Sequence, residues 1–84
     1  LILDRNGVVL ANNYSAYTLE IAPGRVDHLD QTIDALAEVI EIQPRDRKRF
    51  KRLLDESKSV ESLPIRTRLT DEEVADLHRY LQAR

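Results

Sequence analysis

The chain has 84 residues, a formal net charge of −2 and no cysteine. A chain of this length forms one small domain or part of a larger protein, and without cysteine it holds neither a disulfide nor a cysteine-based metal site. No apolar run approaches the roughly 18 residues of a membrane-spanning helix, and the nearly balanced charge excludes a nucleic-acid binder defined by bulk positive charge. The chain opens on an apolar run without an initiator methionine, so we expect a piece of a longer protein.

The first predicted element is a β-hairpin. Two apolar runs, 1–3 and 8–10, flank a tetrapeptide formed by Asp4, Arg5, Asn6 and Gly7. Asn-Gly tolerates the positive φ that a two-residue type I′ turn requires at both central positions. The sequence therefore predicts short antiparallel strands at Ile2–Asp4 and Val8–Ala11, with turn formation as the simplest role of the tetrapeptide.

A third strand and a first helix follow. Alternation of apolar residues predicts a strand at Tyr14–Ala22, which Pro23 and Gly24 end. Apolar residues then recur at helical spacing, which predicts a helix at Asp27–Glu41 with Asp27 as its N-cap. The apolar positions of that helix are Leu29, Ile33, Leu36 and Ile40.

The second half of the chain predicts helix, strand and helix. Pro44 suits the first turn of a helix that ends near residues 57–59 and that Phe50, Leu53 and Leu54 would anchor to the core. Ser62–Leu69 alternates again, and Pro64 indicates either an edge strand or the start of a strand. Thr70 with Glu73 forms a capping box before the apolar stripe of Val74, Leu77 and Leu81. The order β-β-β-α-α-β-α indicates a small α+β domain, a sheet covered by three helices.

No pattern in the chain predicts catalysis, metal binding or a cofactor. His28 and His78 have no second ligand at short spacing, so both are interpreted as surface histidines. Gly-x-Ser-x-Gly, Ser-x-x-Lys and Lys-Thr-Gly are all absent, and the two glycines form no phosphate loop. We therefore expect no catalytic residue, no metal ligand and no cofactor.

Charge is segregated along the chain. Residues 1–44 hold seven acids and two bases (net −5), residues 45–52 one acid and six bases (net +5), and residues 53–84 seven acids and five bases (net −2). The basic run is predicted on a helix whose apolar residues take one side. A solvated or protein-contacting helix face is the favoured interpretation, with nucleic acid and an anionic membrane surface as alternatives.

The hairpin also carries a family motif. The segment from Leu3 to Asn13, with Asp4-Arg5-Asn6-Gly7 followed by Leu10 and Ala11, resembles the stretch after the membrane anchor of class B penicillin-binding proteins. Later segments resemble the elongation-type branch of that class, the penicillin-binding protein 2 family. They are Tyr17-Thr18-Leu19-Glu20-Ile21, Arg49-Phe50, Val60-Glu61-Ser62-Leu63-Pro64-Ile65-Arg66 and Leu69-Thr70 with Glu72-Glu73-Val74-Ala75. The end of the chain, 76–84, departs from the family's usual pattern.

The resemblance implies a non-catalytic module of a larger enzyme. Residues 1–13 would be the hairpin of a pedestal and residues 14–84 an α+β head. A single membrane anchor would lie upstream, and a serine-type D,D-transpeptidase domain that cross-links peptidoglycan would lie downstream. The module would stand on the periplasmic side of the bacterial inner membrane.

The resemblance also implies protein partners. Those expected are an MreC-like scaffold and a RodA-like glycosyltransferase of the elongation complex, together with a possible homodimer, and no nucleic acid. The edge signal of the strand after Ser62 suggests the contact residues Leu63, Ile65 and Arg66, with Tyr14 as an interface-type aromatic. The alternative is an independent small nucleic-acid-binding or regulatory domain that uses the basic helix at 45–52.

Overall fold

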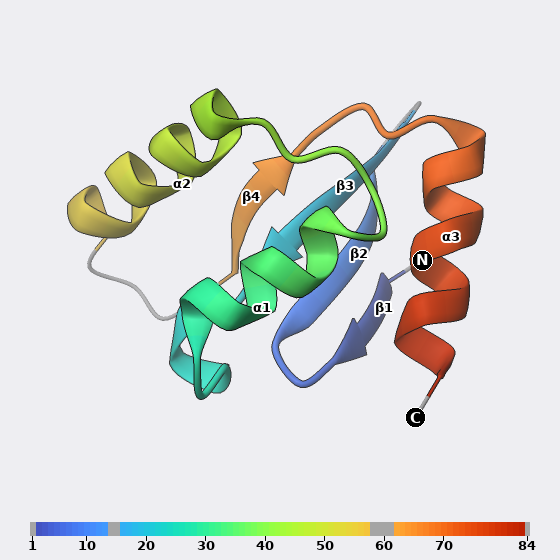
Figure 1. Ribbon diagram of the computed structural model, residues 1–84, viewed down its shortest axis with the longest axis horizontal. Coiled ribbons are helices and arrows are strands. Elements are labelled where there is room, and N and C mark those ends of the chain that lie inside the picture. Colours follow the sequence, from blue (N-terminus) through green and yellow to red (C-terminus); the bar gives the residue numbers. More distant parts are fainter. Residues whose placement is uncertain (1, 14–15, 58–61, 84) are drawn as a thin grey trace.

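The computed structural model describes residues 2–13, 16–57 and 62–83, which form a four-stranded antiparallel sheet and three α-helices (Figure 1). Within the described residues the elements occur in the predicted order, which confirms the α+β class. The strands are β1 (Ile2–Arg5), β2 (Val8–Asn13), β3 (Ala16–Ile21) and β4 (Leu63–Arg66). The helices are α1 (Leu29–Ala37), α2 (Pro44–Glu56) and α3 (Asp71–Gln82), and a 3-10 turn, η1, spans Pro23–Arg25.

The sheet follows the chain, in the order β1-β2-β3-β4. The predicted hairpin is confirmed: β1 pairs with β2, with Arg5 opposite Val8 and Leu3 opposite Leu10. Asn6 has φ 53° and Gly7 φ 88°, so both central residues adopt the left-handed backbone that the Asn-Gly pair predicts.

Gly7 is required for a second reason that the turn alone does not reveal. A Cβ atom at this position would lie 2.8 Å from Cγ1 of Val26 and 3.2 Å from the carbonyl oxygen of Ala22. The Gly7 carbonyl also accepts a hydrogen bond of 2.7 Å from the backbone N–H of Ala22. The hairpin turn is therefore docked against the segment around η1, and only glycine leaves room for that contact.

We expect Gly7→Ala to lower the free energy of unfolding by about 2 kcal/mol, because left-handed strain adds to the contact with Val26. Gly24→Ala is the matched control, since Gly24 is exposed and lies outside the positive-φ region. Urea unfolding followed by circular dichroism measures both variants. Equal stabilities for the two variants would show that the turn tolerates a side chain.

Strand β4 lies at the sheet edge, as Pro64 predicts, but it is shorter than predicted. It pairs with β3 through a register shift between Leu19 and Glu20 and ends at Arg66. Arg68 then takes φ 53°, which turns the chain away from the strand direction. Leu69 is nevertheless buried, and its N–H donates to the carbonyl of Tyr17 at 3.1 Å.

Helix α1 is shorter than predicted at both ends. His28, not Asp27, occupies the N-cap, because the N–H and the hydroxyl of Thr32 both donate to the His28 carbonyl, at 2.9 and 3.0 Å. At the other end the N–H groups of Glu38 and Val39 bond three residues back, which tightens the last turn. Ile40 still enters the core, so the apolar spacing persists beyond the end of the helix.

The other two helices begin where the sequence predicts. Gln43 precedes Pro44, and its N–H donates to Oδ2 of Asp46 at 2.9 Å. At α3 the capping box is confirmed: the Glu73 N–H donates to Oγ1 of Thr70 at 3.1 Å, and the Thr70 N–H donates to Oε1 of Glu73 at 3.0 Å. These bonds satisfy N–H groups that a helix start would otherwise leave without partners.

The core lies between the helices and one face of the sheet. The largest fully buried side chains are Phe50, Leu19, Ile21, Leu36, Ile65 and Leu77. Of the three anchors predicted for α2, Phe50 is in the core, whereas Leu53 and Leu54 are only half-buried. No helix within residues 2–13, 16–57 and 62–83 combines the length and apolarity needed to span a bilayer.

Candidate functional site

The predicted partner edge is partly closed. Leu63 is half-buried, but the side chain of Ile65 is fully buried in the core, so Ile65 could meet a partner strand only through its backbone. Its carbonyl already accepts a hydrogen bond of 3.2 Å from Nη2 of Arg49 on α2. Tyr14 lies outside the described residues. The contact itself stays a prediction.

Arg66, the remaining residue predicted at this edge, bonds to other parts of the same chain. Its guanidinium forms a bidentate pair with Glu73 on α3, with N–O distances of 3.0 and 2.9 Å. It also donates to the carbonyl of Glu41, in the connection between α1 and α2. The side chains of Arg66 and Glu73 are each 18% exposed. Arg66 therefore joins β4 to two other parts of the fold and leaves little surface for a partner.

A second charged network fastens α2 to the outer edge of β4. Asp46 is buried, and its carboxylate accepts from the N–H of Gln43 and from Nη2 of Arg49, both at 2.9 Å. The same Arg49 nitrogen reaches Ile65 across the edge. An incoming strand would have to compete with Arg49 for the Ile65 carbonyl.

The two carboxylates in these networks, Asp46 and Glu73, have lowered pKa values, which favour the ionised form. Burial by itself raises the pKa of Asp46, but the Gln43 N–H and the Arg49 guanidinium outweigh it and hold that pKa below its ordinary value of 3.8. Burial likewise raises the pKa of Glu73, and the hydrogen bonds from Arg66 and Thr70 outweigh it, so the pKa lies below 4.5.

These depressed pKa values predict acid sensitivity. A carboxylate whose pKa is lower in the folded chain stabilises it fully above the unfolded pKa, and that stability is lost as the pH falls through the folded value. The contribution of Asp46 and Glu73 is thus complete at neutral pH and declines below the ordinary values of 3.8 and 4.5. Urea unfolding of Asp46→Asn/Glu73→Gln should show a flatter loss of stability in that acidic range than the parent chain shows. An identical decline in both proteins would contradict the assignment.

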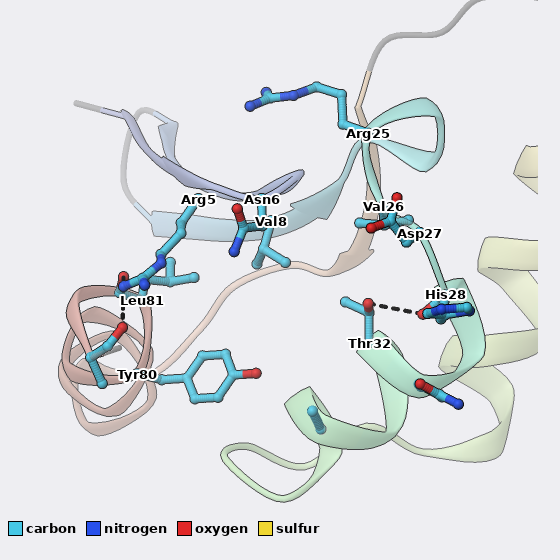
Figure 2. Close-up of a pocket in the computed structure, with 13 residues that line it drawn as sticks. Arg5, Asn6, Val8, Arg25, Val26, Asp27, His28, Thr32, Tyr80 and Leu81 are labelled. Atoms are coloured by element: carbon cyan, nitrogen blue, oxygen red, sulfur yellow. Dashed lines mark hydrogen bonds between the residues drawn. The ribbon is translucent and has the colours of Figure 1, made fainter.

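A cleft of about 600 Å³ opens at the other end of the molecule, beside β1 (Figure 2). The hairpin turn, the segment around η1, α1 and the end of α3 surround it. Tyr80 is 39% exposed, and its ring extends from α3 into the cleft toward α1 (Figure 2). The lining residues are Arg5, Asn6, Val8, Arg25, Val26, Asp27, His28, Gln31, Thr32, Ala35, Tyr80, Leu81 and Ala83.

Arg5 of the family motif has a role that the sequence interpretation missed. Its Nη1 donates to the carbonyl of Leu81 at 2.9 Å and also to the carbonyl of Ala83. A guanidinium at a helix C-terminus satisfies carbonyls that lack a helical partner and complements the negative end of the helix dipole. Because Arg5 and α3 lie at opposite ends of the chain, no local pattern could have revealed this bond.

The motif residues therefore share a hairpin but not one surface. Arg5 and Asn6 line the cleft, Gly7 is buried under the segment around η1, Leu10 is in the core and Ala11 is half-buried. Their hairpin is at the β1 end of the sheet, whereas the predicted partner edge is at the β4 end. The structure does not bring the two groups of predicted residues together.

The basic run of α2 divides into paired and unpaired side chains. Arg47 forms a 2.8 Å ion pair with Asp34 of α1, and Arg49 pairs with Asp46. The four remaining bases are exposed and have no ion-pair partner among the described residues: Arg45, Lys48, Lys51 and Arg52. His28 and His78 are exposed, and no three His, Cys, Asp or Glu residues in the described ranges gather to hold a metal ion.

Comparison with known proteins identifies the family. Residues 1–83 match the family model described as the penicillin-binding protein dimerisation domain. The peptidoglycan D,D-transpeptidase MrdA of Escherichia coli K12 is 39% identical over 75 residues, which cover 89% of this chain and 12% of that protein. MrdA of Acinetobacter baumannii is 34% identical over 74 residues (88% and 11%), and MrdA of Haemophilus influenzae is 29% identical over 75 residues (89% and 12%).

The chain thus spans about 12% of the length of these relatives. The match confirms the resemblance read from the hairpin and later motifs, and with it the prediction of a non-catalytic module. By this match over nearly all of its residues, the chain belongs to the penicillin-binding protein dimerisation-domain family.

Proposed function

We propose that the chain is the interaction module of a peptidoglycan D,D-transpeptidase that acts in cell-wall elongation and cell shape. It would position the transpeptidase domain and dock an MreC-like scaffold and a RodA-like glycosyltransferase on the periplasmic side of the inner membrane. The observation that carries the proposal is the family match over residues 1–83, supported by relatives named as D,D-transpeptidases.

The β4 edge is the surface we assign to the scaffold, with Tyr14 as a further contact. Leu63 keeps part of its side chain at the surface, and Ile65 offers only a backbone carbonyl that Arg49 covers. A partner strand would replace Arg49 at this carbonyl, while Arg66 stays bound to Glu73. Docking at this edge would therefore rely on main-chain bonds and on Leu63.

Titration calorimetry of the chain with the periplasmic part of an MreC-like scaffold tests this proposal. We expect saturable binding that Leu63→Asp weakens by about tenfold or more, since a charge at a buried contact loses its hydration. His78→Ala, at an exposed position of α3, is the matched control. Unchanged binding by Leu63→Asp would remove the β4 edge from the proposal, and no binding by the parent chain would remove scaffold docking.

A second candidate, a nucleic-acid-binding or regulatory domain, would use the unpaired bases of α2. Four exposed cations on one helix resemble a phosphate-contacting surface. Fluorescent duplex DNA in the same buffer supplies the test. Tight DNA binding that Lys48→Glu abolishes would support this candidate, and weak binding that moderate salt removes would reject it.

We also propose that the chain self-associates, since the matched family is described as a dimerisation domain. Sedimentation equilibrium over a range of protein concentrations tests self-association without reference to the scaffold. A single monomer mass at every concentration would reject it.

A further inference from the structure

Helix α1 and its flanking residues present a row of carboxylates. Asp27, Asp30, Asp34, Glu38 and Glu41 recur every three or four residues, and all are exposed. Asp30 and Asp34 are one turn apart in α1 and share one side of it, whereas Asp27 precedes the helix and Glu38 and Glu41 follow it. Asp34 is the member of the row that reaches α2, through its pair with Arg47. We call these five residues the acidic row.

Helix α2 presents the opposite charge next to it. Arg45, Lys48, Lys51 and Arg52 are exposed and unpaired among the described residues, and we call them the basic row. The 2.8 Å pair between Arg47 and Asp34 joins the two helices at the surface. Both helices stand on the same side of the sheet (Figure 1). The two helices joined by this pair therefore carry opposite exposed charge.

We propose that this α1–α2 surface is the interface of a two-fold homodimer. The basic row of one copy would lie on the acidic row of the other, and the reverse contact would form by symmetry. This inference rests on the proposed self-association and adds the surface that performs it. A two-fold interface uses the same patch on both copies, so the patch must be complementary to itself. A patch with one acidic and one basic half meets that condition, whereas a purely basic helix would repel its own copy.

The acidic row also favours a second copy of the chain over a polyanion as the partner of this surface. An anionic membrane or a nucleic acid attracts Lys48 and its neighbours but repels the carboxylates beside them. The chain as a whole adds to this repulsion, because its net charge is −2. A second copy supplies bases for the acidic row as well as acids for the basic row, and it is the partner that both rows fit.

The contact should be weak and sensitive to salt. Nine residues of α1 and 13 of α2 give helices of about 14 and 20 Å. A patch of that size buries less than the roughly 1,200 Å² of a standard stable interface. Its attraction acts between exposed charges, which about 0.1 M salt screens over roughly 10 Å. We therefore expect a dimer at low ionic strength and high protein concentration, and a monomer in concentrated salt.

Charge exchange tests the interface. The first variant, Lys48→Glu/Lys51→Glu, makes the basic row acidic; the second, Asp30→Lys/Glu38→Lys, makes the acidic row basic. None of these four side chains has an ion-pair partner among the described residues, so the substitutions leave the internal pairs intact. We expect each variant alone to self-associate about tenfold more weakly than the parent chain. An equimolar mixture of the two should associate at near-parental affinity, because opposite rows meet again.

The control variant adds charge on α3, away from the proposed interface. His78→Glu/Gln82→Glu adds two negative charges at exposed positions of α3 and should leave the sedimentation equilibrium unchanged. Circular dichroism confirms that each variant is folded. Loss of association in the control as well would assign the effect to net charge and overturn the proposal.

The remaining outcomes separate this inference from the proposals it rests on. Dimerisation that persists in both variants would overturn the α1–α2 interface and leave self-association standing. A parent chain that stays monomeric at low salt would overturn both, while scaffold docking would still be decided by calorimetry. Binding of the parent chain to vesicles with anionic lipid, without self-association, would show that the basic row serves a membrane instead.

Discussion

Phe50→Ala is expected to lower the free energy of unfolding by about 3–5 kcal/mol, the largest effect of any substitution considered for this chain. Phe50 is fully buried and is the only phenylalanine. It is the side chain through which α2 enters the core. The lost stability has two parts: the free energy of burying the ring, and the cost of the cavity that the smaller side chain leaves. Because a domain of this size is stable by only about 5–10 kcal/mol, much of the variant should be unfolded at 37 °C.

Urea unfolding followed by circular dichroism measures this effect, and Leu53→Ala is its control on the same helix. Leu53 is half-buried, so its truncation removes less contact and should have about a third of the effect. A Phe50→Ala variant as stable as Leu53→Ala would mean that α2 does not depend on the core for its position.

Arg66→Ala is expected to lower the free energy of unfolding by about 3 kcal/mol, because breaking a largely buried pair leaves an uncompensated charge. Glu73 would keep its carboxylate at 18% exposure without its cation, and the Glu41 carbonyl would lose a donor. Arg66→Lys should recover only part of the loss, since an ammonium cannot form the bidentate contact.

The Arg79–Asp76 pair on α3 supplies the matched control. Arg79 and Asp76 are both well exposed, so Arg79→Ala should change stability by less than about 0.5 kcal/mol. A double-mutant cycle of Arg66→Ala with Glu73→Gln measures the coupling directly. Coupling near zero would show that Arg66 acts through the Glu41 carbonyl and not through Glu73.

These two predictions bear on the proposed docking edge. Phe50 and Arg49 hold α2 against β4, and Arg66 links β4 to α3, so their loss would disturb the edge together with the fold. Leu63 is half-buried and packs against the core, so the stability of Leu63→Asp is measured by urea unfolding beside its binding. A variant that stays folded and fails to bind then reports on docking alone.

The chemistry of short stretches of sequence was enough to predict much of the fold. Asn6-Gly7 predicted the hairpin, because few residue pairs tolerate two positive φ values in succession. Thr70 and Glu73 predicted the start of α3, because their side chains satisfy the N–H groups of the first turn. Pro64 predicted an edge strand, since proline cannot donate a ladder hydrogen bond. The hairpin motif further indicated the family that the comparison then showed.

The bounds of α1 and β4 required the tertiary structure. The apolar spacing that predicted a helix to Glu41 continues at Ile40, which is buried although the helix ends at Ala37. Periodicity records which side chains face the core, and a tight turn can meet that requirement as well as a helix can. At β4, the positive φ of Arg68 ends an alternation that the sequence alone extends to Leu69.

What the sequence by itself determined was the class of fold, the order of its elements, the hairpin, two of the helix starts and the family. The tertiary structure alone decided how distant charges are used: Arg5 binds the end of α3, Arg49 covers the carbonyl of Ile65, and Arg66 binds Glu73. The physical reason is that turns, caps and periodicity are set by neighbours in the chain. The partner of a long, charged side chain is set by which elements pack together, and no short stretch of sequence records that.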